Sequence, residues 1–139
     1  MRVVKIVVVM SLLIASAALA AGQSKPAVLS KYVLGASEYN RQLEQEKLTA
    51  ADDTEVAGWI VGYKAEAAKM MFALTFFKDG TVVLSMYGSD TPATKYKVVG
   101  LDVFLFDEAS QQYSDMAIGS FGKDRKSFTM VQGTILDKQ

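Results

Sequence analysis

Residues 70–87, MMFALTFFKDGTVVLSMY, give the clearest indication of the fold. Two runs rich in β-branched and aromatic residues, 70–77 and 81–87, flank the tripeptide Lys78-Asp79-Gly80, and such runs favour β-strands. A three-residue hairpin loop closes with a residue in the left-handed region, and Gly80 takes that conformation without steric cost. The sequence therefore predicts a β-hairpin that turns at 78–80.

The length of this loop decides which side chains share a face of the hairpin. A slip of one residue turns every side chain of a strand to the other face, and a two-residue loop would scatter the apolar positions. A three-residue loop gathers six apolar side chains on one face, in the pairs Phe76–Val82, Leu74–Leu84 and Phe72–Met86. We therefore predict that this face lines the inside of a curved sheet.

Two more hairpins are predicted downstream. One joins 93–98 to 101–107 around Val99-Gly100, which sets Lys97 opposite Asp102 as an ion pair and Tyr96 opposite Val103. The other joins 113–121 to 127–136 through the polar residues 122–126. The expected class is α+β, mainly β: an N-terminal helical segment, then an antiparallel meander of about seven strands forming a small barrel or strongly curved sheet.

The region before residue 70 is predicted to be largely helical. Apolar residues at three- and four-residue steps between 28 and 47 indicate one kinked helix or two short ones, interrupted at Gly35: Leu29, Tyr32, Val33, Ala36, Tyr39 and Leu43. Thr49-Ala50-Ala51-Asp52 resembles a capping box, and Asp53 and Glu55 favour a helix N-terminus. Residues 56–70 also fit a helical stripe, but Gly58, Gly62 and the cluster 59–61 favour a strand at 58–63 with an irregular or helical link at 64–69.

The first 20 residues have the pattern of a signal peptide. Arg2 and Lys5 precede an apolar run that ends in Ala18-Leu19-Ala20, which predicts export by the Sec route and cleavage after Ala20. Residues 21–27 are expected to be a flexible lead-in to a single domain, 28–139. The run is too short for a membrane span, so we expect a periplasmic or secreted protein without a stable membrane anchor.

Composition excludes several classes of function. The chain has 15 Lys and Arg against 15 Asp and Glu, and loss of residues 1–20 removes two of the basic residues, for a mature net charge of −2. Nucleic acid is therefore not expected as a partner. With no His and no Cys, His-assisted nucleophiles, thiolate catalysis and disulfides are excluded.

No motif in the chain predicts a reaction, a metal or a cofactor. Ser120-Phe121-Gly122-Lys123 matches S-x-x-K, but it lies at a strand end and lacks the companion motifs of serine–lysine enzymes. The methionines are spread over several strands and are expected to fill the core rather than bind copper. Asp52, Asp53 and Glu55 lack the loop of a calcium site. We expect a protein that is not an enzyme.

The sequence resembles small bacterial secreted lipocalin-like domains at three places. These are Gly58-Trp59, the segment Leu74–Val82 with its F-x-x-D-G hairpin, and Tyr96-Lys97-Val98-Val99-Gly100. The resemblance covers roughly residues 58–136. It implies that Gly58-Trp59 begins the first strand of an antiparallel barrel whose interior holds an apolar ligand, and it implies no reaction.

The candidate binding residues follow from the apolar face and the amphipathic rings. The expected role is to hold a small hydrophobic ligand in, or at the mouth of, the barrel, with Trp59, Tyr63 and Tyr87 near its open end. A core filled by its own side chains is the favoured alternative to a cavity. The full set of candidates is Trp59, Tyr63, Phe72, Leu74, Phe76, Leu84, Met86, Tyr87 and Tyr96.

The alternative function is a periplasmic protein-interaction module of the inhibitor or immunity type. Phe104 and Phe106 fall on the outer face with Lys95, Lys97 and Asp102, where they need cover or a partner. We expect the N-terminal helix to cover them with Tyr32, Val33 and Leu43. If it does not, a protein partner would grip these rings together with Tyr113 or the loop 123–126.

Overall fold

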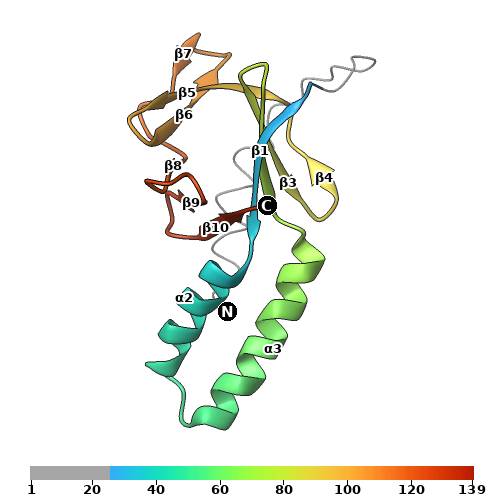
Figure 1. The fold of residues 1–139 in the computed structure, drawn as a ribbon, viewed down its shortest axis with the longest axis vertical. Helices are drawn as coiled ribbons and strands as arrows, with labels where there is room; N and C mark the ends of the chain where they lie inside the picture. The colour runs from blue at the N-terminus through green and yellow to red at the C-terminus, as the bar shows by residue number, and fades with distance from the viewer. Residues whose placement is uncertain (1–25) are drawn as a thin grey trace.

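A computed structural model describes residues 26–139. The signal peptide predicted at 1–20 and most of the lead-in lie outside the described residues. The described chain forms an antiparallel β-barrel with a pair of helices projecting from one of its ends (Figure 1).

The barrel is closed by eight strands. Each strand pairs with the next along the chain, and β1 pairs with both β2 and β10 to complete the ring. The eight are β1 (Val28–Leu34), β2 (Ala73–Phe77), β3 (Thr81–Met86), β5 (Thr94–Val99), β6 (Asp102–Asp107), β8 (Gly119–Phe121), β9 (Ser127–Met130) and β10 (Ile135–Lys138). Two short strands, β4 (Ser89–Asp90) and β7 (Gln112–Tyr113), pair with β3 and β6. The predicted class, mainly β with an antiparallel meander, is confirmed, with one strand more in the barrel than expected.

The hairpin of β2 and β3 has the predicted register. Phe76 pairs with Val82 and Leu74 pairs with Leu84, and all four side chains are buried in the core. The amide of Gly80 donates to the Phe77 carbonyl at 3.2 Å, and the Gly80 φ of +84° is the left-handed conformation that the loop requires. Phe72, just before β2, is buried in the same core, and Met86 packs against it.

The register predicted for β5 and β6 is wrong by two residues. Val99 pairs with Asp102 and Tyr96 with Leu105, so the turn is Gly100-Leu101 and the Lys97–Asp102 ion pair does not form. The predicted turn would place Val99 at the first central position, where the primed turns need a positive φ that a β-branched residue disfavours. Gly100 takes that position instead, with φ +65°. Because the shift is even, Tyr96 and Val103 still share the inner face.

The last predicted hairpin turns where expected, but its second strand is broken. Phe121 pairs with Phe128 across the 122–126 loop. Instead of continuing to 136, the chain turns again at 131–134, where the Met130 amide donates to the Thr134 carbonyl at 2.8 Å. Gly133, with φ +102°, allows this second turn. The predicted strand 113–121 is likewise only β7 and β8, with an irregular segment between them.

The helix predicted from residue 28 is wrong over its first third, which is strand β1. Tyr32 pairs with Leu74 on one side and Lys138 on the other, and its ring is buried in the barrel. Both neighbours offer backbone groups to the segment, and this pairing overrides the local helical spacing. Helix α2 (Ala36–Lys47) begins only after Gly35.

The strand predicted at 58–63 is also wrong, because Asp53–Met70 forms one helix, α3. Its N-cap is Asp52 rather than Thr49: the Asp52 carboxylate accepts from the Glu55 amide at 2.9 Å, and Glu55 accepts from the Ala51 amide at 2.7 Å. The buried residues of α3 are Val56, Tyr63, Ala67 and Met70. Gly58-Trp59 therefore lies inside a helix, and the first strand of the barrel is β1.

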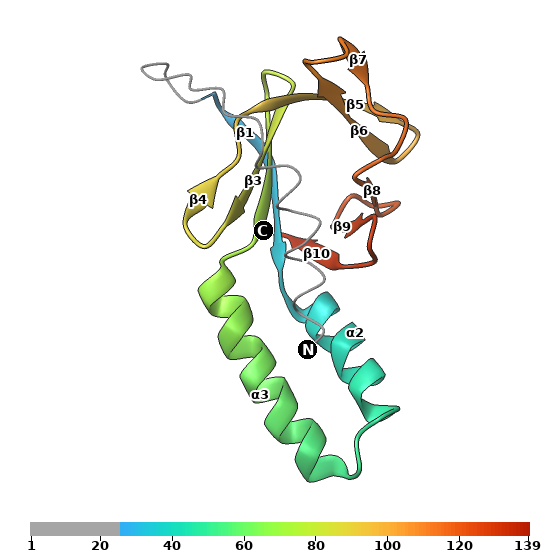
Figure 2. The ribbon, with the colours of Figure 1, turned by 180° about the vertical axis from the view of Figure 1, so that it is seen from behind.

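Helices α2 and α3 form an antiparallel hairpin inserted between β1 and β2. It extends from one end of the barrel, and within residues 26–139 no helix covers the opposite end (Figures 1 and 2). The two helices meet through aromatic side chains, with the rings of Tyr39 and Tyr63 edge to face at 5.8 Å. Neither helix in the described part of the chain has the length and apolarity needed to cross a bilayer.

The expectation that the N-terminal helix covers Phe104 and Phe106 is wrong. Helix α2 packs against β1 and β10 instead. Phe106 is edge-on to Tyr113 at 5.2 Å, and the ammonium of Lys97 lies 5.8 Å from the Phe104 ring. Both phenylalanines are half-buried under these neighbours.

Candidate functional site

The interior of the barrel is packed with aromatic rings rather than hollow. Tyr32, Phe76, Phe121 and Phe128 come from four different strands, and each ring centroid lies 5.1–6.0 Å from at least one other. Phe76 and Phe128 have no solvent-exposed surface. The favoured expectation of a filled core agrees with this packing, and it leaves room for a ligand only near the ends of the barrel.

One pocket of about 220 Å³ lies at the barrel end opposite the helical hairpin. We call it the aromatic pocket. Its floor is the aromatic cluster, and its rim comes from the first residues of β1, the end of β10 and the loop between β8 and β9. The lining residues are Leu29, Ser30, Tyr32, Phe76, Tyr96, Val98, Phe121, Arg125 and Lys138.

A β-bulge in β1 shapes one side of the pocket. Val28 pairs with Phe77 and Ser30 pairs with Phe76, so Leu29 is an extra residue without a partner on β2. Bulges are frequent at barrel rims and beside binding sites, because they bend the strand and redirect side chains. Here the bulge places Leu29 and Ser30 in the pocket lining.

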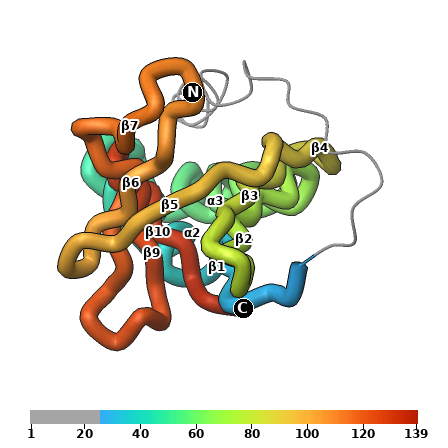
Figure 3. Tube along the Cα trace, turned by 90° about the horizontal axis from the view of Figure 1, so that it is seen from above, coloured from blue at the N-terminus to red at the C-terminus, as the bar shows by residue number. Residues whose placement is uncertain are grey.

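Hydrogen bonds of its backbone fix Arg125 beside the pocket. The Tyr32 hydroxyl donates to the Arg125 carbonyl at 2.7 Å, and the Arg125 amide donates to the Gly122 carbonyl at 2.9 Å. The guanidinium carbon lies 4.8 Å from the centre of the Phe121 ring, a cation–π distance. The Lys138 amide donates to the Lys126 carbonyl, which joins the loop to the end of β10. Figure 3 shows the molecule from above the view of Figure 1, toward this end of the barrel.

The two tyrosines of the pocket stay protonated at neutral pH. Burial raises the pKa of Tyr32 and of Tyr96 above the ordinary value of 10.0, although the positive charge of Arg125 lowers both. Their hydroxyls are therefore hydrogen-bond donors. The Tyr32 hydroxyl donates to Arg125, whereas that of Tyr96 makes no hydrogen bond within residues 26–139.

A second, smaller cavity lies deeper in the barrel. Its volume is about 30 Å³, close to the share of one water molecule in the liquid, so it is too small for an organic ligand. Its lining residues are Leu74, Val82, Leu84, Thr91, Thr94, Leu105, Ile118 and Met130.

The structure separates the nine predicted binding residues into four places. Phe76 and Tyr96 line the aromatic pocket. Phe72, Leu74, Leu84 and Met86 belong to the packed core or contact it. Tyr87 is 52% exposed beside the end of α3, where its amide donates to the Met70 carbonyl.

Trp59 and Tyr63 lie on α3, away from the barrel's open end, so their predicted position there is wrong. The two rings are stacked with centroids 5.2 Å apart. They help to join α3 to α2 through the Tyr39 ring. Trp59 is therefore poorly placed to report ligand binding by its fluorescence.

Sequence reasoning missed seven of the nine lining residues: Leu29, Ser30, Tyr32, Val98, Phe121, Arg125 and Lys138. Tyr32 was assigned to a helix, and Arg125 belongs to a loop considered only as a polar turn or as a contact for a protein partner. An alternation of inward side chains at Ser30, Tyr32 and Leu34 was the one local signal for β1. No local pattern brings the ends of β1, β8 and β10 together, because that proximity comes from closing the barrel.

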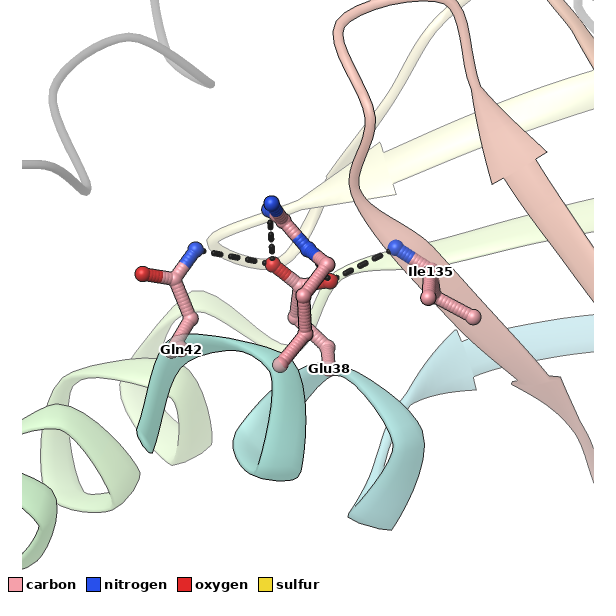
Figure 4. Close-up of polar contacts among 4 residues, drawn as sticks. Glu38, Gln42 and Ile135 are labelled. Atoms are coloured by element: carbon pink, nitrogen blue, oxygen red, sulfur yellow. Dashed lines mark hydrogen bonds and ion pairs between the residues drawn. The ribbon is translucent and has the colours of Figure 1, made fainter. Parts of the chain in front are cut away.

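A buried carboxylate at the opposite end attaches the helical hairpin to the barrel (Figure 4). Glu38 on α2 has no exposed surface and accepts four hydrogen bonds. Arg41 donates through Nε and Nη2 at 2.9 and 2.6 Å, the Gln42 amide donates at 2.9 Å, and the Ile135 backbone amide donates at 2.7 Å. With these donors and no access to solvent, Glu38 has a structural role rather than one in acid–base chemistry.

Residues 26–139 contain no cluster of three or more Asp, Glu, His or Cys side chains that could hold a metal ion. Comparison with known proteins does not assign the chain to a family: no family model, no curated protein and no solved structure matches it.

Proposed function

We propose that this protein is an exported, non-enzymatic binding protein that holds a small hydrophobic ligand in the aromatic pocket. The observation that carries the proposal is an aromatic-floored pocket of about 220 Å³ at the end of the closed barrel opposite the helical hairpin. Ligand sites are typically concave and apolar, with a few polar groups that orient the ligand. The export part of the proposal rests on the sequence of residues 1–20 alone.

The volume limits the size of the ligand. Drug-sized ligands occupy pockets of about 300–1,000 Å³, whereas an apolar cavity of about 150 Å³ binds benzene. A pocket of about 220 Å³ fits one ring or a short branched chain with a few further atoms. A long fatty acid would have to displace the packed rings of the core, which costs several kcal/mol.

Filling the pocket with a side chain tests the proposal. We expect phenylacetamide, a neutral single-ring probe, to bind with a dissociation constant on the order of 1 mM. In amide NMR spectra it should shift signals of the pocket residues and leave the Trp59 indole signal in place. Val98→Phe should abolish these shifts, because Val98 lines the pocket.

The matched control is Val99→Phe, which adds the same ring one residue away on the outer face, where Val99 is 57% exposed. It should bind the probe like the original protein. Ser30→Leu fills the pocket from the opposite wall and replaces Val98→Phe if that variant fails to fold. Two outcomes would contradict the proposal. One is that the probe still binds to a folded variant whose pocket is filled, and the other is that the probe does not bind to the original protein.

A protein-interaction role is the second candidate, and one observation favours it. The helical hairpin carries large apolar side chains in solvent: Leu48 is 85% exposed, Val61 69% and Met71 61%. Native mass spectrometry of the protein from its own host separates the candidates. A retained mass of a small molecule supports pocket binding, and a retained protein supports the second role.

A further inference from the structure

We infer that the ligand is an amphipathic monoanion, a single ring or short acyl chain bearing one carboxylate, with Arg125 and Lys138 binding the carboxylate. This inference rests on the proposed function and adds the chemical class of the ligand. It follows from three features of the pocket mouth: two cations that form no ion pair within residues 26–139, a guanidinium stacked on the Phe121 ring, and a tyrosine hydroxyl that makes no hydrogen bond within the same residues.

The two cations at the mouth are not paired within the described part of the chain. The ion pairs between residues 26 and 139 are Arg41–Glu38, Lys47–Glu44 and Lys69–Glu66, none of which includes Arg125 or Lys138. A pocket whose charged lining residues are both positive favours an anion over a neutral or cationic ligand.

The two acids whose charges reach the pocket tyrosines accept hydrogen bonds within their own turns. Asp124 and Asp79 are close enough to influence the pocket tyrosines. Asp124 accepts from the Lys126 amide at 3.0 Å, within its own turn. Asp79 accepts from the amide and the hydroxyl of Thr81 at 3.0 and 2.6 Å. Both carboxylates thus hold turns together, and among residues 26–139 neither forms an ion pair with Arg125 or Lys138.

Arg125 is pre-organised for a planar anion. Its backbone is fixed by Tyr32 and Gly122, and its guanidinium lies over the Phe121 ring. A guanidinium presents paired N–H donors that match a carboxylate, and fixing it in advance lowers the entropy lost on binding. Lys138 adds a second charge from β10, and the unpartnered Tyr96 hydroxyl adds a neutral donor on the pocket wall.

The test compares phenylacetate with phenylacetamide, which share a ring and differ in charge. We expect the acid to bind about tenfold more tightly than the amide at low salt. Added sodium chloride should reduce that advantage, because the cations are near the surface. Arg125→Gln should weaken the binding of phenylacetate by about tenfold and leave the binding of phenylacetamide unchanged. Lys138→Gln should have a smaller effect of the same kind.

Lys123→Gln is the matched control, since it removes one positive charge from the same loop at an exposed residue outside the pocket. It should leave both affinities unchanged. Equal binding of acid and amide, or equal losses in Arg125→Gln and Lys123→Gln, overturns the carboxylate inference while the pocket remains a binding site. Failure of both probes to bind overturns the proposed function itself.

Discussion

Glu38 shows how one residue can join a helix to the barrel. Its carboxylate is fully buried, yet every hydrogen bond it accepts comes from a defined donor on α2 or β10. A buried charge with a complete set of donors adds specificity to a contact, but removal of one member leaves the others unsatisfied. We therefore regard Glu38 as the attachment point of the hairpin to the barrel.

Replacement of Glu38 should strongly destabilise the protein. Glu38→Ala leaves the Ile135 amide and the Arg41 side chain without their acceptor, and we expect a loss of about 3 kcal/mol in the free energy of unfolding. Urea denaturation measures this loss. Glu44→Ala on the same helix breaks only an exposed pair with Lys47, and it should cost less than about 0.5 kcal/mol. Similar losses in the two variants would contradict the structural role of Glu38.

At the scale of elements, α3 is a helix despite a composition that favours a strand. Gly58, Gly62 and the β-prone cluster between them weaken helix propensity. Two features outweigh that weakness. Asp52 and Glu55 cap the start of the helix, and its buried stripe makes tertiary contacts, which routinely override propensity. The helical stripe was visible in the sequence, but its strength relative to the glycines was not.

The glycines of α3 give a prediction about this element. A Cβ built at Gly58 or Gly62 meets no atom within 4 Å, so Gly→Ala at either position should stabilise the protein by about 0.5–1 kcal/mol. Gly80→Ala is the contrasting control, since its φ of +84° makes any side chain costly. Thermal denaturation compares the three variants. A loss of stability in Gly58→Ala would mean that this face of α3 is covered in solution.

Hairpins were the most predictable elements. The loop at 78–80 and its register followed from one glycine and the alternation of apolar residues, and the structure confirms both. In the second hairpin the predicted residues still face the barrel interior although the register differs by two residues, because a shift of two leaves every side chain on the same face of the strand. Strand β1 was not predictable in this way, since its partners lie far along the chain.

At the scale of the whole molecule, the barrel class followed from short strands and regular turns, but the pocket did not. Its walls come from β1, β2, β5, β8 and β10, and only closure brings them to one mouth. The predicted site residues Phe76 and Tyr96 were found because they belong to the apolar face that the sequence specifies. No local sequence pattern marks Arg125 or Lys138, so their shared position at the pocket mouth becomes visible only in the closed ring.

Buried tyrosines link the stability of the whole fold to alkaline pH. Burial raises the pKa of Tyr63 well above its ordinary value of 10.0, and the charge of Glu38 acts in the same direction. Above about pH 10 the unfolded chain releases this proton while the folded state retains it, so the free energy of unfolding falls as pH rises. Below about pH 10, Tyr63 does not contribute to the pH dependence of the free energy of unfolding.

We expect Tyr63 to contribute a fall of up to about 1.4 kcal/mol per pH unit above pH 10. Urea denaturation at a series of alkaline pH values measures the slope. Tyr63→Phe cannot ionise, so its slope should be shallower by that amount. An unchanged slope in this variant would show that the Tyr63 proton is not held more tightly in the folded state.

The pairing of β1 with β10 also determines when the barrel can close during protein synthesis. The first strand to leave the ribosome needs the last one as its neighbour, with Tyr32 beside Lys138 and Val33 beside Asp137. Until β10 emerges, β1 has one unpaired edge, the ring stays open, and the groups that form the pocket mouth remain apart. Arrival of β10, rather than growth of any one hairpin, is therefore the event that forms the aromatic pocket.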